Sequence, residues 1–277
     1  MSADSLIRRM VGSFLDGTFI IKIYNRLAHV QYVPEVKPDI DQYGAKHYPG
    51  HRWNALPPSA KRAWINFWPL FKQTKIKTIA YVGANDGQIA VDIDDAFPGI
   101  SFYLIEPVPH IFNSLVRKID GRKNMHAVNM AAGNQCTYQE MYVDSFGPAS
   151  SLLPYQPIAT EEFPFLGKQE MVRVETCPLD KILIEQRAKP IDMIIMDVQG
   201  YEDIVLKGAE QTLDQCKAVV SELSLQPLYK NSSVFDSVYQ VLIAKGFRLN
   251  YLINPICGIN RNILQIDGIF LREKAFQ

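Results

Sequence analysis

Downstream of residue 75, short apolar runs alternate with longer segments whose apolar residues are spaced three or four apart. The runs predict strands and the spaced segments predict amphipathic helices. One run, residues 193–196, is apolar throughout, which indicates burial on both faces, as in a parallel sheet. The predicted strands are residues 78–82, 101–105, 125–129, 192–196, 217–222, 246–252 and 265–271. The predicted helices are residues 88–96, 109–119, 179–187, 202–214 and 233–245.

The last two predicted strands are separated only by a loop, residues 254–262. They therefore predict an antiparallel hairpin at one edge of the sheet, because a parallel pair needs a long crossover. The other strands alternate with helices, which is the pattern of a doubly wound, Rossmann-like α/β sheet. We expect one seven-stranded sheet within residues 76–277.

Residues 1–75 differ in composition and predict an N-terminal extension. Residues 1–30 have the apolar spacing of an amphipathic helix. Residues 31–58 carry five prolines among aromatic residues, which favours an ordered irregular arm. Residues 59–68 predict a short helix that ends before Pro69. None of these residues has a place in the predicted sheet.

The predicted first helix has more than one interpretation. Its basic residues leave peripheral membrane contact open, although such a helix more often packs on its own protein or on a partner subunit in a homo-oligomer. No apolar stretch approaches the ~20 residues that a transmembrane helix needs, and no signal peptide is visible. We therefore expect a soluble, cytoplasmic protein.

Charge and cysteine content narrow the classes of partner. Lys plus Arg and Asp plus Glu both number 29, which argues against a nucleic acid partner, since phosphate contacts need a basic face. The four cysteines lie about forty residues apart and form no Cys-x-x-Cys pair. We interpret them as free, small buried residues in a reducing compartment, without a zinc site. They are Cys136, Cys177, Cys216 and Cys257.

A glycine-containing turn follows the first strand of the predicted sheet. The turn runs from Gly83 through Ala84 and Asn85 to Gly87, and the strand after the next helix ends at Glu106. Strand, glycine turn, helix, strand and acid form the opening unit of a nucleotide-type site. The glycines let the backbone approach a ligand, and the helix N-terminus offers unpaired N–H groups. We expect the Glu106 carboxylate to accept both hydroxyls of an adenosine ribose.

The glycine spacing decides among cofactors. The dinucleotide fingerprint is Gly-x-Gly-x-x-Gly. Asn85 stands in place of its second glycine and the third is also absent, which disfavours a nicotinamide-dependent oxidoreductase. A P-loop is excluded because no Gly-Lys-Ser/Thr follows. S-adenosylmethionine is the candidate that remains.

Two acids end neighbouring strands of the predicted sheet. Asp197 follows the strand 192–196, and Glu222 ends the strand 217–222. Ligands of open α/β sheets bind beside such strand ends. The two carboxylates can share a proton, hold a substrate hydroxyl or ligate Mg²⁺, and capping of a helix or plain surface exposure are the alternatives.

Taken together, these motifs resemble the FkbM-like family of S-adenosylmethionine-dependent methyltransferases, whose class I fold has seven strands and a terminal hairpin. The resemblance covers residues 76–273, and Cys177-Pro178 and Met196 depart from the usual family pattern. It adds Pro107, Asn129 and Ala131 to the expected cofactor contacts, together with Asp197. The matching motifs are residues 81–87, 97–98, 106–109, 129–131, 150–152, 176–180, 197–202, 205–209, 245–247 and 265–270.

The resemblance implies methyl transfer to an oxygen, usually a hydroxyl of a sugar or a natural product. A neutral alcohol loses its proton during the attack, which a nearby carboxylate can accept. Asp197 is our first candidate for that base and Glu222 the second, with His110 a weaker one. Ser150 and Ser151 are candidate hydrogen-bond donors. A divalent metal is left open without being predicted, and the alternative function is a methyltransferase-like domain that binds cofactor or a partner without catalysis.

Overall fold

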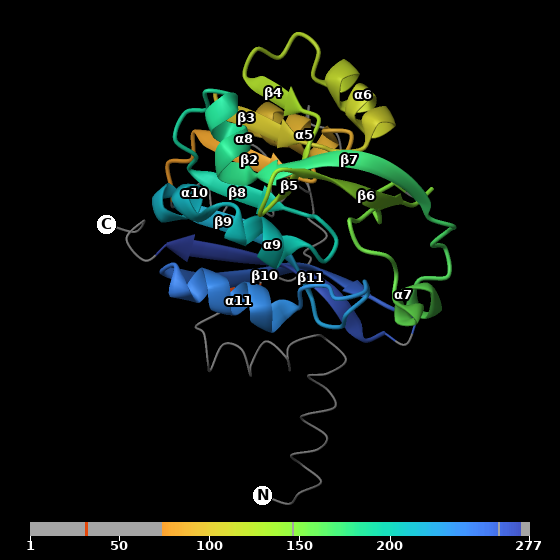
Figure 1. Cartoon of the computed structure of the whole chain (residues 1–277). Helices are drawn as coiled ribbons and strands as arrows, with labels where there is room; N and C mark the ends of the chain where they lie inside the picture. Colours follow the sequence, from red (N-terminus) through yellow and green to blue (C-terminus); the bar gives the residue numbers. More distant parts are fainter. Residues whose placement is uncertain (1–30, 33–73, 146, 260, 273–277) are drawn as a thin grey trace, which may run out of the picture.

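The computed structural model describes residues 31–32, 74–145, 147–259 and 261–272. Its main sheet has the strand order β1-β10-β11-β9-β8-β2-β3-β4 (Figure 1). The strands β2, β3, β4, β8 and β9 pair in parallel, and β11 runs antiparallel between β9 and β10. The strand bounds are β1 Gln31–Tyr32, β2 Thr78–Val82, β3 Ser101–Ile105, β4 Met125–Val128, β8 Met193–Met196, β9 Ala218–Ser224, β10 Phe247–Cys257 and β11 Ile263–Arg272.

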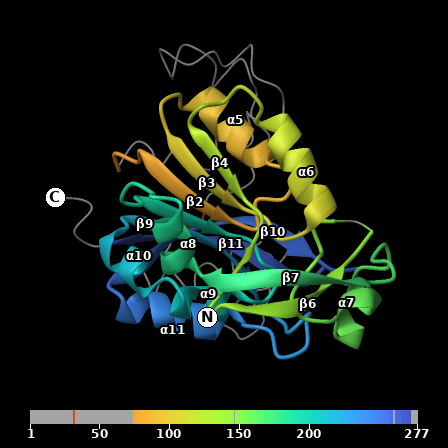
Figure 2. The same cartoon turned by 45° about the horizontal axis from the view of Figure 1, so that its top comes forward.

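Helices cover both faces of this sheet, as the continuous apolar strands require. On one face α8 (Leu179–Glu185), α9 (Glu202–Lys207), α10 (Glu210–Gln215) and α11 (Phe235–Ala244) pack on a single apolar cluster. On the other face α5 (Gln88–Ala96) and α6 (Pro109–Lys118) pack on a second cluster. Figures 1 and 2 show the two groups of helices on opposite sides of the strands.

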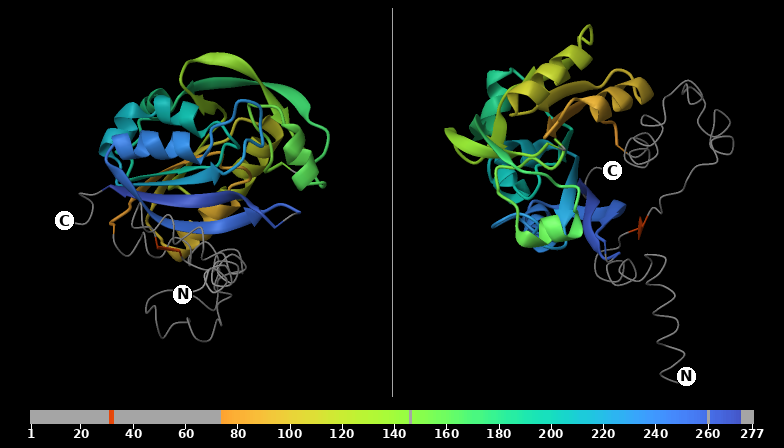
Figure 3. Two further views of the ribbon diagram at one scale, coloured as in Figure 1. Left: turned by 90° about the horizontal axis from the view of Figure 1, so that it is seen from below. Right: turned by 90° about the vertical axis from the view of Figure 1, so that its right-hand side faces the viewer.

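The structure confirms the predicted class I methyltransferase plan. Every predicted strand is present, and the hairpin β10–β11 runs along one side of the domain (Figure 3). One prediction about the extension is wrong, since Gln31 and Tyr32 form β1 and pair in parallel with β10. The predicted helices within residues 1–30 and 59–68 lie outside the described residues.

The predicted helix 202–214 is in fact two helices, α9 and α10, with Gly208 and Ala209 between them. The chain at Gly208 passes directly against another backbone, because a Cβ added there would lie 1.8 Å from the carbonyl oxygen of Gly133. Only glycine allows this approach. The break therefore follows from packing against a part of the molecule that sequence periodicity does not reveal.

That part is the insertion between β4 and α8, in which the sequence pattern predicted no strand or helix. It contains a second sheet with the order β5-β7-β6, and one short helix. Strands β6 and β7 pair antiparallel along their whole length and, with α7, lie together at the right of Figure 1. The bounds are β5 Ala131–Gly133, β6 Thr137–Val143, α7 Pro157–Glu162 and β7 Glu170–Pro178.

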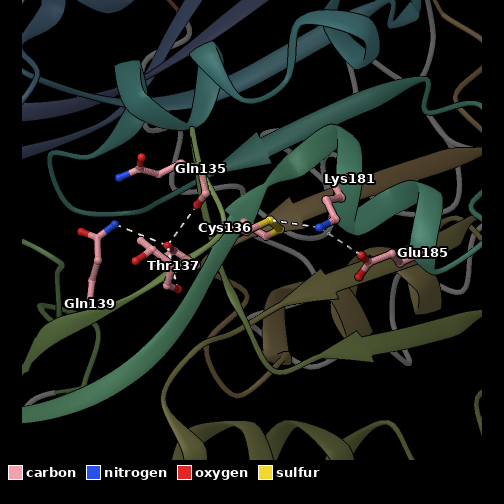
Figure 4. Close-up of a disulfide and its surroundings, with 8 residues drawn as sticks. Gln135, Cys136, Thr137, Gln139, Lys181 and Glu185 are labelled. Carbon is pink, nitrogen blue, oxygen red and sulfur yellow. Dashed lines mark hydrogen bonds and ion pairs between the residues drawn. A yellow bond between two sulfur atoms is a disulfide. The ribbon is translucent and has the colours of Figure 1, made fainter.

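A disulfide joins two of the cysteines that we expected to be free. Cys136 lies in the turn between β5 and β6, and Cys177 lies in β7 opposite Ala132 of β5. The pairing of β5 with β7 therefore brings together two residues that are 41 positions apart. Lys181 donates to the Cys136 sulfur at 3.4 Å (Figure 4). Our argument for a reducing compartment rested on free cysteines, so this pairing removes it.

Cys216 and Cys257 are free, and Cys216 is buried as predicted, whereas Cys257 is exposed. Within the described ranges, no helix combines the length and the apolar character needed to cross a bilayer.

Candidate functional site

The strand register brings four acidic residues into one row of the main sheet. Val82 of β2 pairs with Ile105 and with Met196, and Met196 pairs with Ser221. The next positions form a row at the C-terminal ends of the parallel strands, where ligands bind in open α/β sheets. Its members are Glu106, Gly83, Asp197, Glu222 and, opposite Glu222 on β11, Asp267.

A cavity of about 350 Å³ lies at the β2–β3 end of this row. We call it the first cavity. Its volume is within the range of small-molecule sites. Seven of the predicted cofactor contacts line it, and these are Gly83, Ala84, Asn85, Glu106, Pro107, Ala131 and Asp197.

Glu106 lies at the wall of the first cavity and is only 5% exposed. Its Oε2 accepts the N–H of Asn85 at 3.0 Å, and its Oε1 accepts the N–H of Val108 at 2.9 Å. Burial raises the pKa of Glu106 to about 7, and these two N–H donors oppose the rise. Each carboxylate oxygen has a second lone pair, so the group can still accept the two hydroxyls of a ribose. These residues fit S-adenosylmethionine at this point.

The two glycines of the turn have structural roles, and close approach of a ligand to either of them stays a prediction. A Cβ at Gly83 would lie 1.9 Å from the carbonyl oxygen of Asp197, and a Cβ at Gly87 would lie 2.4 Å from Cδ1 of Leu115. Both glycines also have φ of +79°. Gly83 therefore lets β2 approach the end of β8, and Gly87 lets α6 pack on the start of α5. Gly87 is not among the residues that line the first cavity.

Asn129 was another predicted cofactor contact, and it too lies outside the lining of the first cavity. Its side-chain amide donates to the carbonyl oxygens of Glu106 and Pro107, both at 2.9 Å. The residue thus holds the backbone that carries the Glu106 carboxylate. Direct contact between Asn129 and a cofactor stays a prediction.

Gln199 connects the two candidate bases. Its side-chain Nε2 donates to Oδ1 of Asp197 and to Oε2 of Glu222, each at 2.8 Å. Gln265 also donates to Oε2 of Glu222, at 2.7 Å. The hydroxyl of Tyr229 donates to Oε1 of Gln199 at 2.7 Å. The network fixes the distance between the two acids and the orientation of the amide.

Both acids of this network are biased toward the protonated form. Burial raises the pKa of Asp197, and the hydrogen bond from Gln199 opposes the rise. Burial and then the charge of Asp197 raise the pKa of Glu222 well above its usual value. Two coupled carboxyl groups in such a place titrate as a pair and do not both ionise readily. The pair can therefore share one proton and carry one negative charge.

A second cavity, of about 290 Å³, lies on the other side of Asp197. We call it the second cavity. Its polar lining consists of Asp197, Gln199, Glu222, Tyr229 and Gln265. Asp197 lines both cavities, whereas Glu222 is buried and, of the two cavities, lines only the second.

The remaining candidates have other positions. Ser150 lines the first cavity, and its Oγ accepts the N–H of Asp144 at 3.1 Å. Ser151 is buried, and its Oγ donates to the carbonyl oxygen of Gln199 at 2.8 Å, so it supports the network. His110 is exposed on α6 and lines neither the first nor the second cavity.

The side chain between the two acids also indicates whether they can bind a metal ion together. The amide Nε2 of Gln199 lies within hydrogen-bond distance of both carboxylates, and an N–H donor cannot be a ligand of Mg²⁺. The residues as placed fit a hydrogen-bonded acid pair and do not fit a shared Mg²⁺ site.

Sequence reasoning missed several residues of this site. Gln199 stood beside Asp197 in a quoted motif, and its amide side chain was the signal for a partner of the acid. Gln265 likewise began the matching motif 265–270 and was not singled out, whereas Tyr229 had no local signal because it reaches the network from a loop.

Comparison with known proteins identifies the family. The chain matches the methyltransferase FkbM domain over residues 82–249. It is 25% identical over 177 residues to the 2-O-methyltransferase NoeI of Sinorhizobium fredii, covering 58% of this chain and 69% of NoeI. Among solved structures it is similar to Aeropyrum pernix fibrillarin with bound S-adenosyl-L-methionine, at 13% identity and a TM-score of 0.41, over 70% of this chain and 66% of that one. It is also similar to a precorrin-6y methyltransferase of Geobacter metallireducens, at 8% identity and a TM-score of 0.44, over 76% and 87%. Because the domain match spans more than half of its length, the chain belongs to the FkbM family and is an S-adenosylmethionine-dependent methyltransferase.

Proposed function

We propose that this protein transfers a methyl group to a hydroxyl oxygen of a small molecule or a glycan. The observation that carries the proposal is the position of Asp197, which lines both the first and the second cavity. With the cofactor in the first cavity and the acceptor in the second, this carboxylate lies between the two reactants. The name of the similar protein NoeI, a 2-O-methyltransferase, supports oxygen as the acceptor atom.

Three acidic residues, Glu106, Asp197 and Glu222, would have separate roles in this reaction. Glu106 accepts the ribose hydroxyls of the cofactor, and the residues that line the first cavity hold the rest of it. S-adenosylmethionine supplies an activated methyl group when it is bound. Asp197 accepts the proton of the acceptor hydroxyl, and its raised pKa makes it a stronger base than an exposed Asp. Glu222 in its protonated form would leave the single negative charge of the pair on Asp197.

Asp197→Asn tests this proposal, because it keeps the shape of the side chain and removes the proton acceptor. We expect methyl transfer to fall at least about a hundredfold, the usual size of a general-base effect, with cofactor affinity nearly intact. Labelled S-adenosylmethionine with a panel of hydroxyl compounds measures transfer, and calorimetry measures cofactor binding. Near-normal turnover in this variant would rule Asp197 out as the base.

Asp267→Asn is the matched control, because Asp267 stands in the same row and lines neither cavity. We expect it to retain turnover. An EDTA arm belongs in the same assay, since activity that is lost with EDTA and restored by Mg²⁺ would reassign Asp197 and Glu222 as metal ligands.

The alternative is a domain that binds cofactor without catalysis. The enclosed acid that lines both cavities favours the enzyme. Cofactor binding at micromolar concentration, without transfer to any acceptor in cell extract, would favour the alternative.

A further inference from the structure

The second cavity combines one polar side with a mainly apolar remainder. Its apolar lining comes from four separate segments, which are Pro148 and Ala149, α7 with the loop after it, the loop after β9 and the end of β10. The residues concerned include Phe163, Phe165, Leu166, Leu228 and Ile256. The rings of Phe163 and Phe165 lie 5.8 Å apart in a tilted arrangement.

Two of these apolar side chains are exposed although large. Phe165 is 61% exposed and Ile256 is 43% exposed, and both line the second cavity. Single exposed apolar residues are ordinary, but these two line one cavity from separate segments of the chain. They give the cavity apolar surface that is accessible to a ligand.

The polar side of the cavity offers acceptors more than donors. The amides of Gln199 and Gln265 already donate to the carboxylates, and the Tyr229 hydroxyl already donates within the network. What remains for an incoming molecule is the second N–H of Gln265 and the free oxygens of the two carboxyl groups, which can partner one or two hydroxyls. A polyhydroxylated ring would place most of its hydroxyls against apolar walls without partners, and burial of an unpaired hydroxyl is unfavourable.

We propose that the second cavity binds the methyl acceptor and selects a hydroxyl group carried on an apolar ring or alkyl body. The inference rests on the O-methyl transfer proposed above and names its substrate class. The apolar body packs on Phe163, Phe165 and Ile256, and its single hydroxyl reaches the acid pair. Asp197 takes the hydroxyl proton as the new O–CH₃ bond forms and the S–CH₃ bond of the cofactor breaks, which leaves S-adenosylhomocysteine.

Two probes of equal ring number and opposite polarity test this selectivity. 4-Phenylcyclohexanol has two six-membered rings and one hydroxyl, whereas methyl cellobioside has two such rings and many hydroxyls. Calorimetry or saturation-transfer NMR on the full chain, with S-adenosylhomocysteine at saturation, measures binding without turnover. We expect the alcohol to bind at least about tenfold more tightly.

Phe165→Ser and Ile256→Ser test the position of the site. Both side chains are exposed, so the fold should tolerate the change, and each should weaken 4-phenylcyclohexanol about three- to tenfold by removing apolar contact. Ile184→Ser is the matched control, because Ile184 is 66% exposed on α8 and lines neither cavity. S-adenosylhomocysteine affinity should be the same in all three variants.

The outcomes separate this inference from the proposed function. Equal or tighter binding of the disaccharide, or unchanged binding of the alcohol in both cavity variants, would overturn the inference. Binding of the alcohol as expected, without methyl transfer to it or to any related alcohol, would defeat O-methyl transfer while the selectivity of the cavity stands. Transfer to methyl cellobioside in preference to the alcohol would overturn the selectivity of the cavity, while O-methyl transfer would stand.

Discussion

Asp197 and Glu222 stand in the same row of the main sheet but differ in the cavities they line and in their hydrogen-bond partners. Asp197 lines both cavities, whereas Glu222 is buried and accepts hydrogen bonds from both Gln199 and Gln265. Gln199 itself has φ of +53°, a conformation that only a minority of non-glycine residues adopt. Backbone strain at that position is consistent with a functional constraint on where the amide points.

Gln199→Met removes the shared donor and keeps the length of the side chain. The Gln199 hydrogen bond lowers the pKa of Asp197, so its loss should raise that pKa. Because the base must be ionised, the acid limb of the pH profile of kcat/KM should move to higher pH. Gln265→Met, which removes a donor to Glu222 alone, should move the limb less. An unmoved or lowered acid limb in Gln199→Met would show that the amide does not position the base.

Glu106 should control cofactor affinity and its dependence on pH. Glu106→Ala should weaken S-adenosylmethionine by roughly 1.5–3 kcal/mol, the usual size for hydrogen bonds to a charged group. The pKa of Glu106 is raised to about 7, and ribose hydroxyls donate better to the ionised form, so affinity should increase as pH rises from 6 to 8. Glu106→Gln should flatten this increase. Calorimetry measures the affinity across that range. If affinity depended on pH equally in the parent and in Glu106→Gln, the assignment of Glu106 to the ribose would be contradicted.

At the scale of elements, sequence patterns predicted the main sheet well and the insertion poorly. The central strands β2 and β8 of the main sheet are buried throughout, and a search for apolar runs finds them. In contrast, β7 alternates Val172, Val174 and Thr176 with charged residues, and its pairing partner β6 is mostly exposed at its start. That period of two was a strand signal that a search for apolar runs does not register. The disulfide was hidden for a related reason, because its spacing has meaning only once β5 and β7 are paired.

The disulfide should stabilise the insertion and, through it, the domain. Closing a segment of 41 residues restricts the unfolded chain, and removal of such a bond typically lowers the free energy of unfolding by about 2–4 kcal/mol. We expect dithiothreitol to lower the urea midpoint of the parent to that of Cys136→Ser, and to have no effect on that variant. Cys257→Ser is the control, since Cys257 is exposed and free, and it should respond to reductant like the parent. Four titratable thiols in the native, non-reduced protein would contradict the pairing.

At the scale of the whole molecule, the site is assembled from segments that are distant in the chain. Asp197 follows β8, Gln265 comes from β11, and Phe163 comes from the insertion. A sequence pattern places a residue at the end of a strand, but it does not show which loop lies above that end. For this reason the first cavity, built largely around two consecutive strands, is lined by most of the cofactor contacts that the sequence predicted, whereas most of the residues that line the second cavity were not named.

The same assembly places several acids in surroundings that resist ionisation. Burial raises the pKa of Glu202, of Asp267 and of Glu106 to about 7 in each case. The reference values are 4.5 for Glu and 3.8 for Asp, so the folded protein binds more protons than the unfolded chain above those values. Stability therefore should fall as pH rises from about 4.5 through 7, and level off once the folded groups have ionised.

Glu202→Gln isolates one group of this set. Glu202 is 3% exposed and lines neither cavity, and its Oε1 accepts the N–H of Gly200 at 3.1 Å, a bond that a Gln carbonyl can keep. Ser233 can turn its hydroxyl from Oε2 of Glu202 to the carbonyl oxygen of Gly200, 3.0 Å away. Between pH 4.5 and pH 8 the free energy of unfolding of the variant should therefore fall by about 3 kcal/mol less than that of the parent. This follows from about 1.4 kcal/mol for each pKa unit. Urea unfolding at several pH values measures this, and Asp203→Asn on the same helix controls for the loss of one charge. A slope that is the same in Glu202→Gln and the parent would mean that Glu202 is ionised in the folded protein throughout this range, with a partner other than Gly200 and Ser233 to stabilise its charge.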